Sequence, residues 1–84
     1  MNTVNWTKKA FKQARKLGHQ ARVQVVKDAG SLKDFPNVAG VKALTNHQYA
    51  YRLRSGDYRI FFEYDGEIKI VTIEEVKKRD ERTY

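Results

Sequence analysis

Arginine side chains gathered on one short segment are the groups of this sequence best suited to chemistry. Arg52, Arg54 and Arg59 lie on either side of a Ser-Gly-Asp sequence. A guanidinium group stays positively charged and can donate two parallel hydrogen bonds to a phosphate. A single arginine on an exposed strand is common. Three of them on one face of a sheet favour a phosphate-binding site.

Two tight turns are needed to place these arginines. Asp65-Gly66 lies between runs rich in aromatic and β-branched residues, which predicts a β-hairpin with a two-residue loop. Ser55-Gly56 predicts a second loop of the same length, and this loop places Arg52 opposite Arg59. The predicted pairs of the Asp65-Gly66 hairpin are Tyr64 with Glu67, Phe62 with Lys69, Ile60 with Val71, Arg59 with Thr72 and Tyr58 with Ile73.

The predicted register divides the side chains between two faces of the sheet. The apolar face forms a core from Tyr51, Leu53, Tyr58, Ile60, Val71 and Ile73. The other face carries Arg52, Arg54, Arg59, Phe61, Ile68, Ile70 and Thr72. Like charges directly opposite each other destabilise a sheet. Folding alone therefore gives no reason for Arg52 to face Arg59, whereas an anionic ligand would neutralise both charges.

The rest of the chain is predicted to support this sheet. Alternation of polar and apolar residues predicts an edge strand over residues 3–6, and helical spacing predicts helices over residues 8–17 and 19–33. A short strand over residues 41–44 follows. We expect an α+β fold in which an N-terminal helical hairpin packs on one face of a small antiparallel sheet of about four strands. No repeat or linker interrupts the sequence, which predicts one domain over residues 1–84.

Composition narrows the classes of partner and site. The 84 residues carry a net charge of +7, which favours nucleic acid, an acidic protein or an anionic membrane surface as partner. The absence of cysteine excludes disulfides and thiolate metal sites. Two distant histidines, His19 and His47, make a histidine-built metal site unfavourable. The sequence has no long apolar run or signal-like start, which predicts a cytoplasmic protein without a membrane partner.

Two segments carry a resemblance to a known family. They are residues 54–59, Arg-Ser-Gly-Asp-Tyr-Arg, and residues 79–84, Arg-Asp-Glu-Arg-Thr-Tyr. Together with the order strand, two helices and meander, they resemble the RelE/ParE superfamily of bacterial toxins from type II toxin–antitoxin systems, and they favour its RelE-like branch. RelE-like toxins are ribosome-dependent mRNA endonucleases, or mRNA interferases, which inhibit translation and are neutralised by a cognate antitoxin. ParE-like toxins share the fold but bind and inhibit DNA gyrase.

The resemblance implies a cleavage that needs no metal and no cofactor, in which a ribose 2′-hydroxyl attacks the adjacent phosphate of the mRNA. The implied catalytic residues are Arg52, Arg54, Arg59, Arg79 and Tyr84. Arg59 and Arg79 would bind the scissile phosphate, and Tyr84 would stack on a base or transfer a proton. Arg52 and Arg54 would bind flanking phosphates or lower the barrier to deprotonation. Arg82 is an alternative to Arg79, because the spacing to the closing tyrosine differs among members.

The proton acceptor stays open at this point. Arginine is a poor general base because it is normally fully protonated. A tyrosine whose pKa is lowered by neighbouring cations could serve, as could His47 or Glu74 if the fold brings either side chain close.

The resemblance also implies an antitoxin partner. Phe61, Ile68 and Ile70 are expected on the open sheet face, where a segment rich in acidic and apolar residues could cover them. The alternative is that the C-terminal tail of the chain covers them itself.

Overall fold

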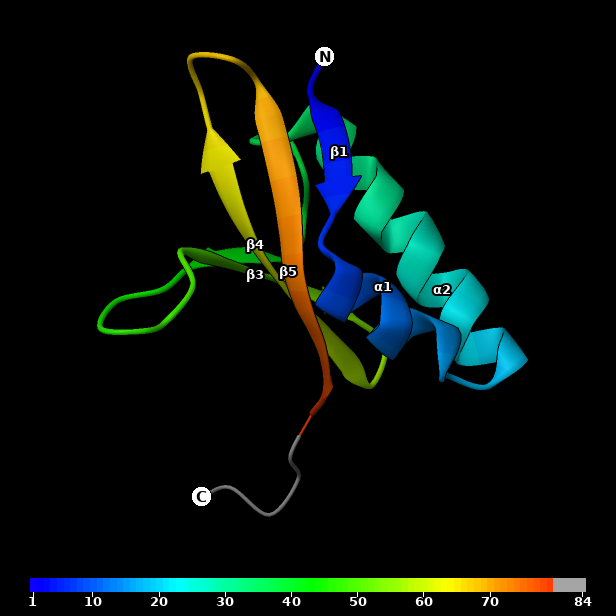
Figure 1. The fold of residues 1–84 in the computed structure, drawn as a ribbon. Helices are drawn as coiled ribbons and strands as arrows, with labels where there is room; N and C mark the ends of the chain where they lie inside the picture. The colour runs from blue at the N-terminus through cyan, green and yellow to red at the C-terminus, as the bar shows by residue number, and fades with distance from the viewer. Residues whose placement is uncertain (80–84) are drawn as a thin grey trace.

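A computed structural model of the chain describes residues 1–79. Its elements are, in chain order, β1 (Thr3–Trp6), α1 (Lys8–Arg15), α2 (His19–Gly30), the short 3-10 helix η1 (Ser31–Asp34), β2 (Val41–Ala43), β3 (Tyr51–Ser55), β4 (Tyr58–Asp65) and β5 (Ile70–Lys78). Figure 1 shows both helices on one side of the sheet, while the loop between β2 and β3 extends on the other side. The predicted α+β class and the helical layer on one face are confirmed.

The sheet has five strands in the order β1-β5-β4-β3-β2. The predicted edge position of the first strand is confirmed, but β1 pairs with β5 in parallel, whereas the other neighbours are antiparallel. The sheet thus has one strand more than the about four expected, and one of its pairs is parallel where an antiparallel sheet was expected. The parallel pair joins strands near opposite ends of the sequence, so no turn motif in the sequence could predict this pairing.

The core lies between the helices and the sheet. It is formed by fully or almost fully buried side chains from α1, α2, η1 and the three central strands: Ala10, Val25, Ala29, Leu32, Leu53, Ile60, Phe62, Val71, Ile73 and Val76. Thr7 caps α1, because its hydroxyl oxygen accepts a hydrogen bond from the N–H of Ala10 at 3.1 Å. The core face predicted from alternation along β3, β4 and β5 is thus largely the observed one.

The loop between β3 and β4 differs from the predicted one. Gly56 and Asp57 are the two loop residues, and Gly56 adopts a φ of 57°, which glycine tolerates without steric cost. Arg54 rather than Arg52 therefore lies opposite Arg59. The register differs from the predicted one by two positions along the strands, and the side-chain period of a strand is also two. Each arginine consequently stays on the predicted face although its partner changes.

The hairpin between β4 and β5 also has a longer loop than predicted. Asp65 pairs with Ile70, so residues 66–69 form the loop and the predicted pair of Tyr64 with Glu67 was wrong. The Asp65 carboxylate accepts the backbone N–H of Glu67 at 2.9 Å and that of Ile68 at 3.3 Å, which holds the wider turn. The longer loop also shifts the other predicted pairs of this hairpin, which were therefore wrong: Phe62 with Lys69, Ile60 with Val71, Arg59 with Thr72 and Tyr58 with Ile73.

Candidate nucleic-acid interface

A row of like charges crosses the sheet face that the helices leave open. Arg54 of β3 lies opposite Arg59 of β4, and Arg59 lies opposite Lys77 of β5. The neighbouring Ile60 points into the core, so alternation directs these three cationic side chains away from the helices. Opposed like charges destabilise strand pairing, so the stability of the sheet gives no reason for this row.

Arg52 lies beside this row, between Lys42 of β2 and Phe61 of β4. Its side chain is half-buried, and its Nε is buried without a hydrogen-bond partner among residues 1–79. Burial, followed by the positive charges of Arg59, Arg54 and Arg79, lowers the pKa of the Arg52 guanidinium. Arg52 is therefore close enough to the other three arginines to be repelled by them.

Arg79 joins the group from the end of β5. Its backbone N–H donates to the carbonyl oxygen of Asp57 at 2.7 Å, which holds it at the loop between β3 and β4. The structure thus brings together the four predicted residues Arg52, Arg54, Arg59 and Arg79, here called the arginine cluster. The other two predicted site residues, Arg82 and Tyr84, lie outside the described residues.

The apolar residues expected on this face do not form one open patch. Phe61 is only 7% exposed, because His47 and Tyr49 from the loop of residues 44–50 cover its ring. Ile68 is exposed in the turn of residues 66–69, and Ile70 is half-buried at the start of β5. Phe61 lies on the predicted face, but the β2–β3 loop covers it, and Ile68 lies in the turn rather than in the sheet. The expectation of one open apolar patch was therefore wrong.

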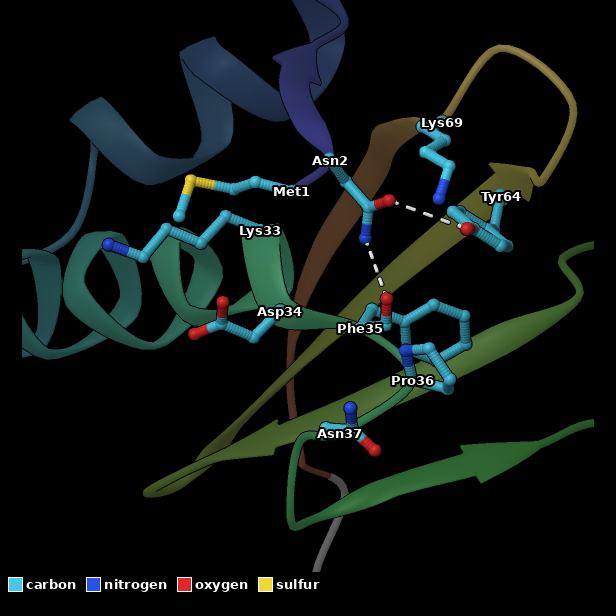
Figure 2. A pocket seen from close by; sticks show the side chains of 9 residues that line it. All are labelled: Met1, Asn2, Lys33, Asp34, Phe35, Pro36, Asn37, Tyr64 and Lys69. Atoms are coloured by element: carbon cyan, nitrogen blue, oxygen red, sulfur yellow. Dashed lines mark hydrogen bonds between the residues drawn. The ribbon is translucent and has the colours of Figure 1, made fainter.

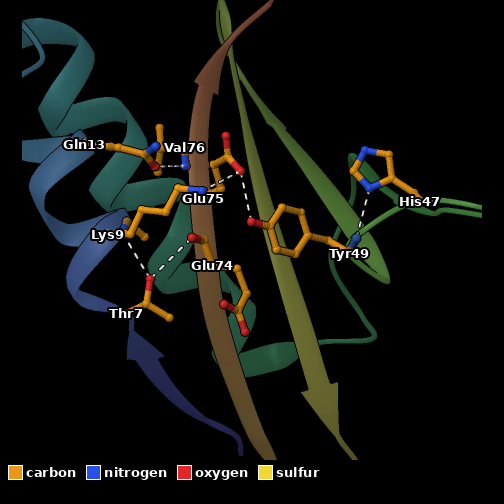
Figure 3. Close-up of polar contacts among 9 residues, drawn as sticks. Thr7, Lys9, Gln13, His47, Tyr49, Glu74, Glu75 and Val76 are labelled. Carbon is orange, nitrogen blue, oxygen red and sulfur yellow. Dashed lines mark hydrogen bonds and ion pairs between the residues drawn. The ribbon is translucent and has the colours of Figure 1, made fainter.

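A polar network anchors this loop to the sheet (Figure 3). The Tyr49 hydroxyl donates to Oε1 of Glu75 at 3.0 Å, and Nζ of Lys9 lies 3.3 Å from the same oxygen. Burial alone would raise the pKa of Glu75, but the hydrogen bonds from Tyr49 and Lys9 and the charges of Lys9 and Lys77 outweigh it and lower that pKa. Burial, followed by the contact with Glu75, raises the pKa of the Tyr49 phenol. At neutral pH Tyr49 therefore stays protonated and Glu75 ionised, which suits an anchor rather than an acid–base pair.

A β-bulge in β5 decides which glutamate reaches this face. Glu74 is the extra residue, so Glu75 rather than Glu74 lies opposite Phe61. The helical layer holds the bulge: the Thr7 hydroxyl donates to the Glu74 carbonyl at 3.3 Å, and Oε1 of Gln13 accepts a backbone N–H of β5 at 2.7 Å (Figure 3). Two residues outside the sheet therefore place Glu75 beside the aromatic rings.

His47 is oriented in a way that bears on its suggested role as proton acceptor. The backbone N–H of Tyr49 donates to its Nδ1 at 3.0 Å. In the neutral ring the proton then sits on Nε2, which becomes a hydrogen-bond donor. In this orientation neither nitrogen of the neutral ring offers a free lone pair. His47 is therefore placed to donate or to stack, and not to take a proton from a ribose hydroxyl.

A hollow of about 580 Å³ lies near the hairpin end of β4, away from Arg59 at the other end of that strand (Figure 2). Asn2 is buried at its edge, where its amide nitrogen donates to the carbonyl oxygens of Leu32 at 3.2 Å and Phe35 at 2.7 Å. Its amide oxygen accepts from the Tyr64 hydroxyl at 3.3 Å. These bonds satisfy Asn2 and tie the start of the chain to η1 and β4, which is a structural role.

Comparison with known families identifies the fold. A family model described as the ParE toxin of a type II toxin–antitoxin system, parDE, matches residues 4–83. The chain belongs to the RelE/ParE superfamily of type II toxins. This confirms the membership predicted from residues 54–59 and 79–84. No helix of the toxin within residues 1–79 has the length and apolar character needed to cross a membrane.

Solved structures similar to the toxin include complexes of RelE with RelB. A chain of the toxin–antitoxin complex RelBE2 from Mycobacterium tuberculosis superposes with a TM-score of 0.79 and 31% identity, over 93% of this chain and 98% of that one. A chain of the intact E. coli RelBE toxin–antitoxin complex gives 0.74 and 27%, over 95% and 99%. The archaeal RelE–RelB complex from Pyrococcus horikoshii OT3 gives 0.81 and 23%, over 98% of both chains, which shows a shared fold. A search of curated proteins found no match.

The anchor of Tyr49 on Glu75 can be tested by its effect on stability. We expect Glu75→Gln to lower the free energy of unfolding by about 1 kcal/mol at pH 7, because a charged hydrogen bond becomes a neutral one and an exposed ion pair is lost. Thermal melts should show a Tm lowered by roughly 4–8 °C. Glu67→Gln, in an exposed turn, is the matched control with no expected change.

The same effect has a defined pH dependence. Because the folded-state pKa of Glu75 lies below its ordinary value of about 4.3, its contribution to stability is present above that value. It is lost as the pH falls through the lower folded-state pKa. The difference between wild type and Glu75→Gln should therefore vanish in strong acid. A difference that persists there would contradict the assigned role of the carboxylate.

Proposed function

We propose that this toxin is a ribosome-dependent mRNA endonuclease that arrests translation. The observation that supports this proposal is the arginine cluster, whose positive charges are not neutralised by carboxylates of residues 1–79. Within residues 1–79 the one ion pair joins Lys9 to Glu75, so none of the four arginines is paired with a carboxylate of that part of the chain. Four clustered guanidinium groups provide the charge and the directed donors that a bound phosphodiester needs.

Cleavage would use the ribose 2′-hydroxyl of the message as nucleophile. This oxygen gives its proton to water and attacks the adjacent phosphorus in line. The new bond closes a 2′,3′-cyclic phosphate, the bond to the 5′-oxygen breaks, and the leaving 5′-oxygen takes a proton from water. Negative charge grows on the phosphate oxygens during this step, where Arg59 and Arg79 stabilise it. Arg52 and Arg54 bind the flanking phosphates, with Arg82 as a further phosphate contact. Tyr84 stacks on a base or transfers the proton.

Dependence on the ribosome follows from this small set of catalytic groups. The proposed site supplies charge, but charge alone does not hold a single strand in the in-line geometry. A ribosome that fixes the message in that geometry can contribute several kcal/mol to catalysis, about 7 kcal/mol for well-oriented reactants. Free mRNA would therefore be a poor substrate.

A cognate antitoxin is the second partner of this proposal, since the solved relatives include toxin–antitoxin complexes. The structure offers an apolar groove of about 230 Å³ on the helical side, lined by Trp6, Phe11, Ala14, Arg15, Arg22 and Val26. Phe11 is 52% and Val26 50% exposed, and two arginines flank them. An antitoxin segment that combines apolar and acidic residues fits this groove by apolar contact and by charge.

The endonuclease proposal is tested by comparing substrates and by mapping ends. Purified toxin should cut a message in the A site of a ribosome at discrete positions, and it should cut the same naked message at least about a hundredfold more slowly. In cells, mRNA 5′ ends mapped after induction should show new ends inside coding regions. Equal rates on naked and ribosome-bound message would exclude ribosome dependence, and the absence of new ends would exclude the endonuclease.

A second candidate function is inhibition of DNA gyrase without catalysis. It is favoured by the family model, whose description is that of a ParE toxin. The arginine cluster would then contact gyrase rather than RNA. Pulse labelling after induction separates the two functions: amino-acid incorporation falls first for the endonuclease, and thymidine incorporation falls first for the gyrase inhibitor.

A further inference from the structure

The loop of residues 44–50 is held over the open sheet face as a rigid unit. At its base, the N–H of Leu44 donates to the carbonyl oxygen of Ala50 at 2.8 Å. The N–H of Ala50 donates to Oε2 of Glu63 in β4 at 3.1 Å, and the Tyr49 hydroxyl binds Glu75 in β5. Asn46 takes a φ of 51° where the loop turns, a conformation that asparagine tolerates better than most residues. The loop is thus tied to β4 and β5.

This loop presents the ring of His47 in a fixed orientation. The imidazole stacks on Phe61, with ring centroids 5.2 Å apart and an angle of 13° between the planes. The hydrogen bond from the Tyr49 N–H to Nδ1 prevents the ring from turning over freely. Burial falls from Phe61 through Tyr49 to His47, which is exposed. His47 is therefore the outermost member of an aromatic stack, with a flat ring that is open to solvent.

The stack lies next to the arginine cluster. Phe61 is directly opposite Arg52 in β3, so the two side chains are neighbours on one face of the sheet. Arg59 lies two residues before Phe61 on the same face, which is a separation of about 7 Å along the strand. A nucleotide whose phosphate is bound by these arginines would therefore have its own base, or the next one, within reach of His47.

We propose that the exposed face of His47 is a nucleobase-stacking site, supported from beneath by Phe61 and Tyr49, that positions the message beside the arginine cluster. This inference rests on the proposed endonuclease function. A base stacked on the imidazole would also meet the Nε2–H donor at the ring edge. Stacking on an aromatic ring accepts every base but orders its plane, and ordering the base places the attached ribose and phosphate. His47 is on this view a positioning residue that touches the substrate without taking part in proton transfer.

The test uses purified toxin, ribosomes and messages that carry an abasic nucleotide at each position of the A-site codon in turn. His47→Ala should slow cleavage of the intact message roughly five- to 150-fold, the range expected for one lost base–aromatic stack. His47→Phe, which keeps a flat ring over Phe61, should stay within about threefold of wild type. At one abasic position the wild-type cleavage rate should fall by a similar factor. On that message His47→Ala should cleave no more slowly than wild type, because the base that would stack is already absent.

Several results would overturn the inference. Cleavage by His47→Ala at the wild-type rate would exclude a role of the ring in cleavage. Loss of the same factor on intact message and on every abasic message would indicate a purely structural role. Unchanged cleavage with weakened neutralisation by the antitoxin would assign the ring to the protein partner instead. Arg59→Ala separates the endonuclease proposal from the stacking proposal. If wild type cuts and Arg59→Ala does not, the endonuclease stands, and an unexpected result with the His47 variants contradicts only the stacking site. If wild type cuts no message, the proposed function fails and the stacking site with it.

Discussion

Arg59→Ala is expected to reduce cleavage of ribosome-bound message by about 10²–10³-fold, which is the usual effect of removing one charged or directed donor from a developing oxyanion. Arg59 is at the centre of the arginine cluster, since it lies opposite both Arg54 and Lys77 and contributes to the lowered pKa of Arg52. The measurement is a single-turnover rate with saturating toxin, supported by 5′-end mapping in cells that express wild type or variant.

The same substitution should not destabilise the fold. Arg59 faces two cations, so its removal relieves repulsion of about 0.2–1 kcal/mol per opposed pair. We expect an unchanged or slightly raised Tm together with the lost activity. Arg15→Ala is the matched control: this arginine lies on α1, 5.8 Å from the Phe11 ring, on the helical side of the sheet. Retained cleavage by Arg59→Ala, or equal losses in both variants, would remove the support for the phosphate site.

Phe62→Ala is expected to have the largest effect on stability, a loss of about 3–5 kcal/mol. The side chain is fully buried and packs against two aromatic rings, Phe35 at 5.3 Å edge-on and Tyr51 at 5.3 Å stacked. A domain of this size has a total stability of about 4–13 kcal/mol, so much of it would be lost. Urea unfolding should show a lower midpoint with an unchanged m-value.

Another phenylalanine, Phe11, provides the control for that prediction. Phe11→Ala removes a ring that is 52% exposed, and it should cost no more than about 1 kcal/mol. Phe61 is not a matched control, because its ring is buried under His47 and Tyr49 rather than in the core between the helices and the sheet. If Phe62→Ala were as mild as Phe11→Ala, the sheet and helices would not share the core that the structure shows.

The two faces of the sheet were predictable from the sequence. Side chains alternate along a strand, so Leu53 and Ile60 face one way and Arg52 and Arg59 the other in any register that differs from the predicted one by an even number of residues. The predicted register of β3 and β4 was off by two residues, and the grouping of the arginines survived that error. The family membership was likewise predictable, since it is carried by short segments of the sequence.

The pairing within each face was not predictable, because it depends on the two loops and on the bulge. The loop after Asp65 is widened because the Asp65 carboxylate accepts hydrogen bonds from later backbone N–H groups, which a two-residue template does not include. The bulge at Glu74 is held by Thr7 and Gln13, residues far away in the sequence. Contacts with the helical layer therefore decided that Glu75 would meet Tyr49.

The sequence by itself determined the class of fold, the family, and the charge that gathers on one face, because each follows from local periodicity, short motifs or composition. Tertiary structure alone decided that Arg79 returns to Asp57, that β1 pairs in parallel with β5, and that His47 lies over Phe61. These contacts join segments that are distant along the chain. Their geometry depends on turn lengths and packing, which local residue patterns do not encode.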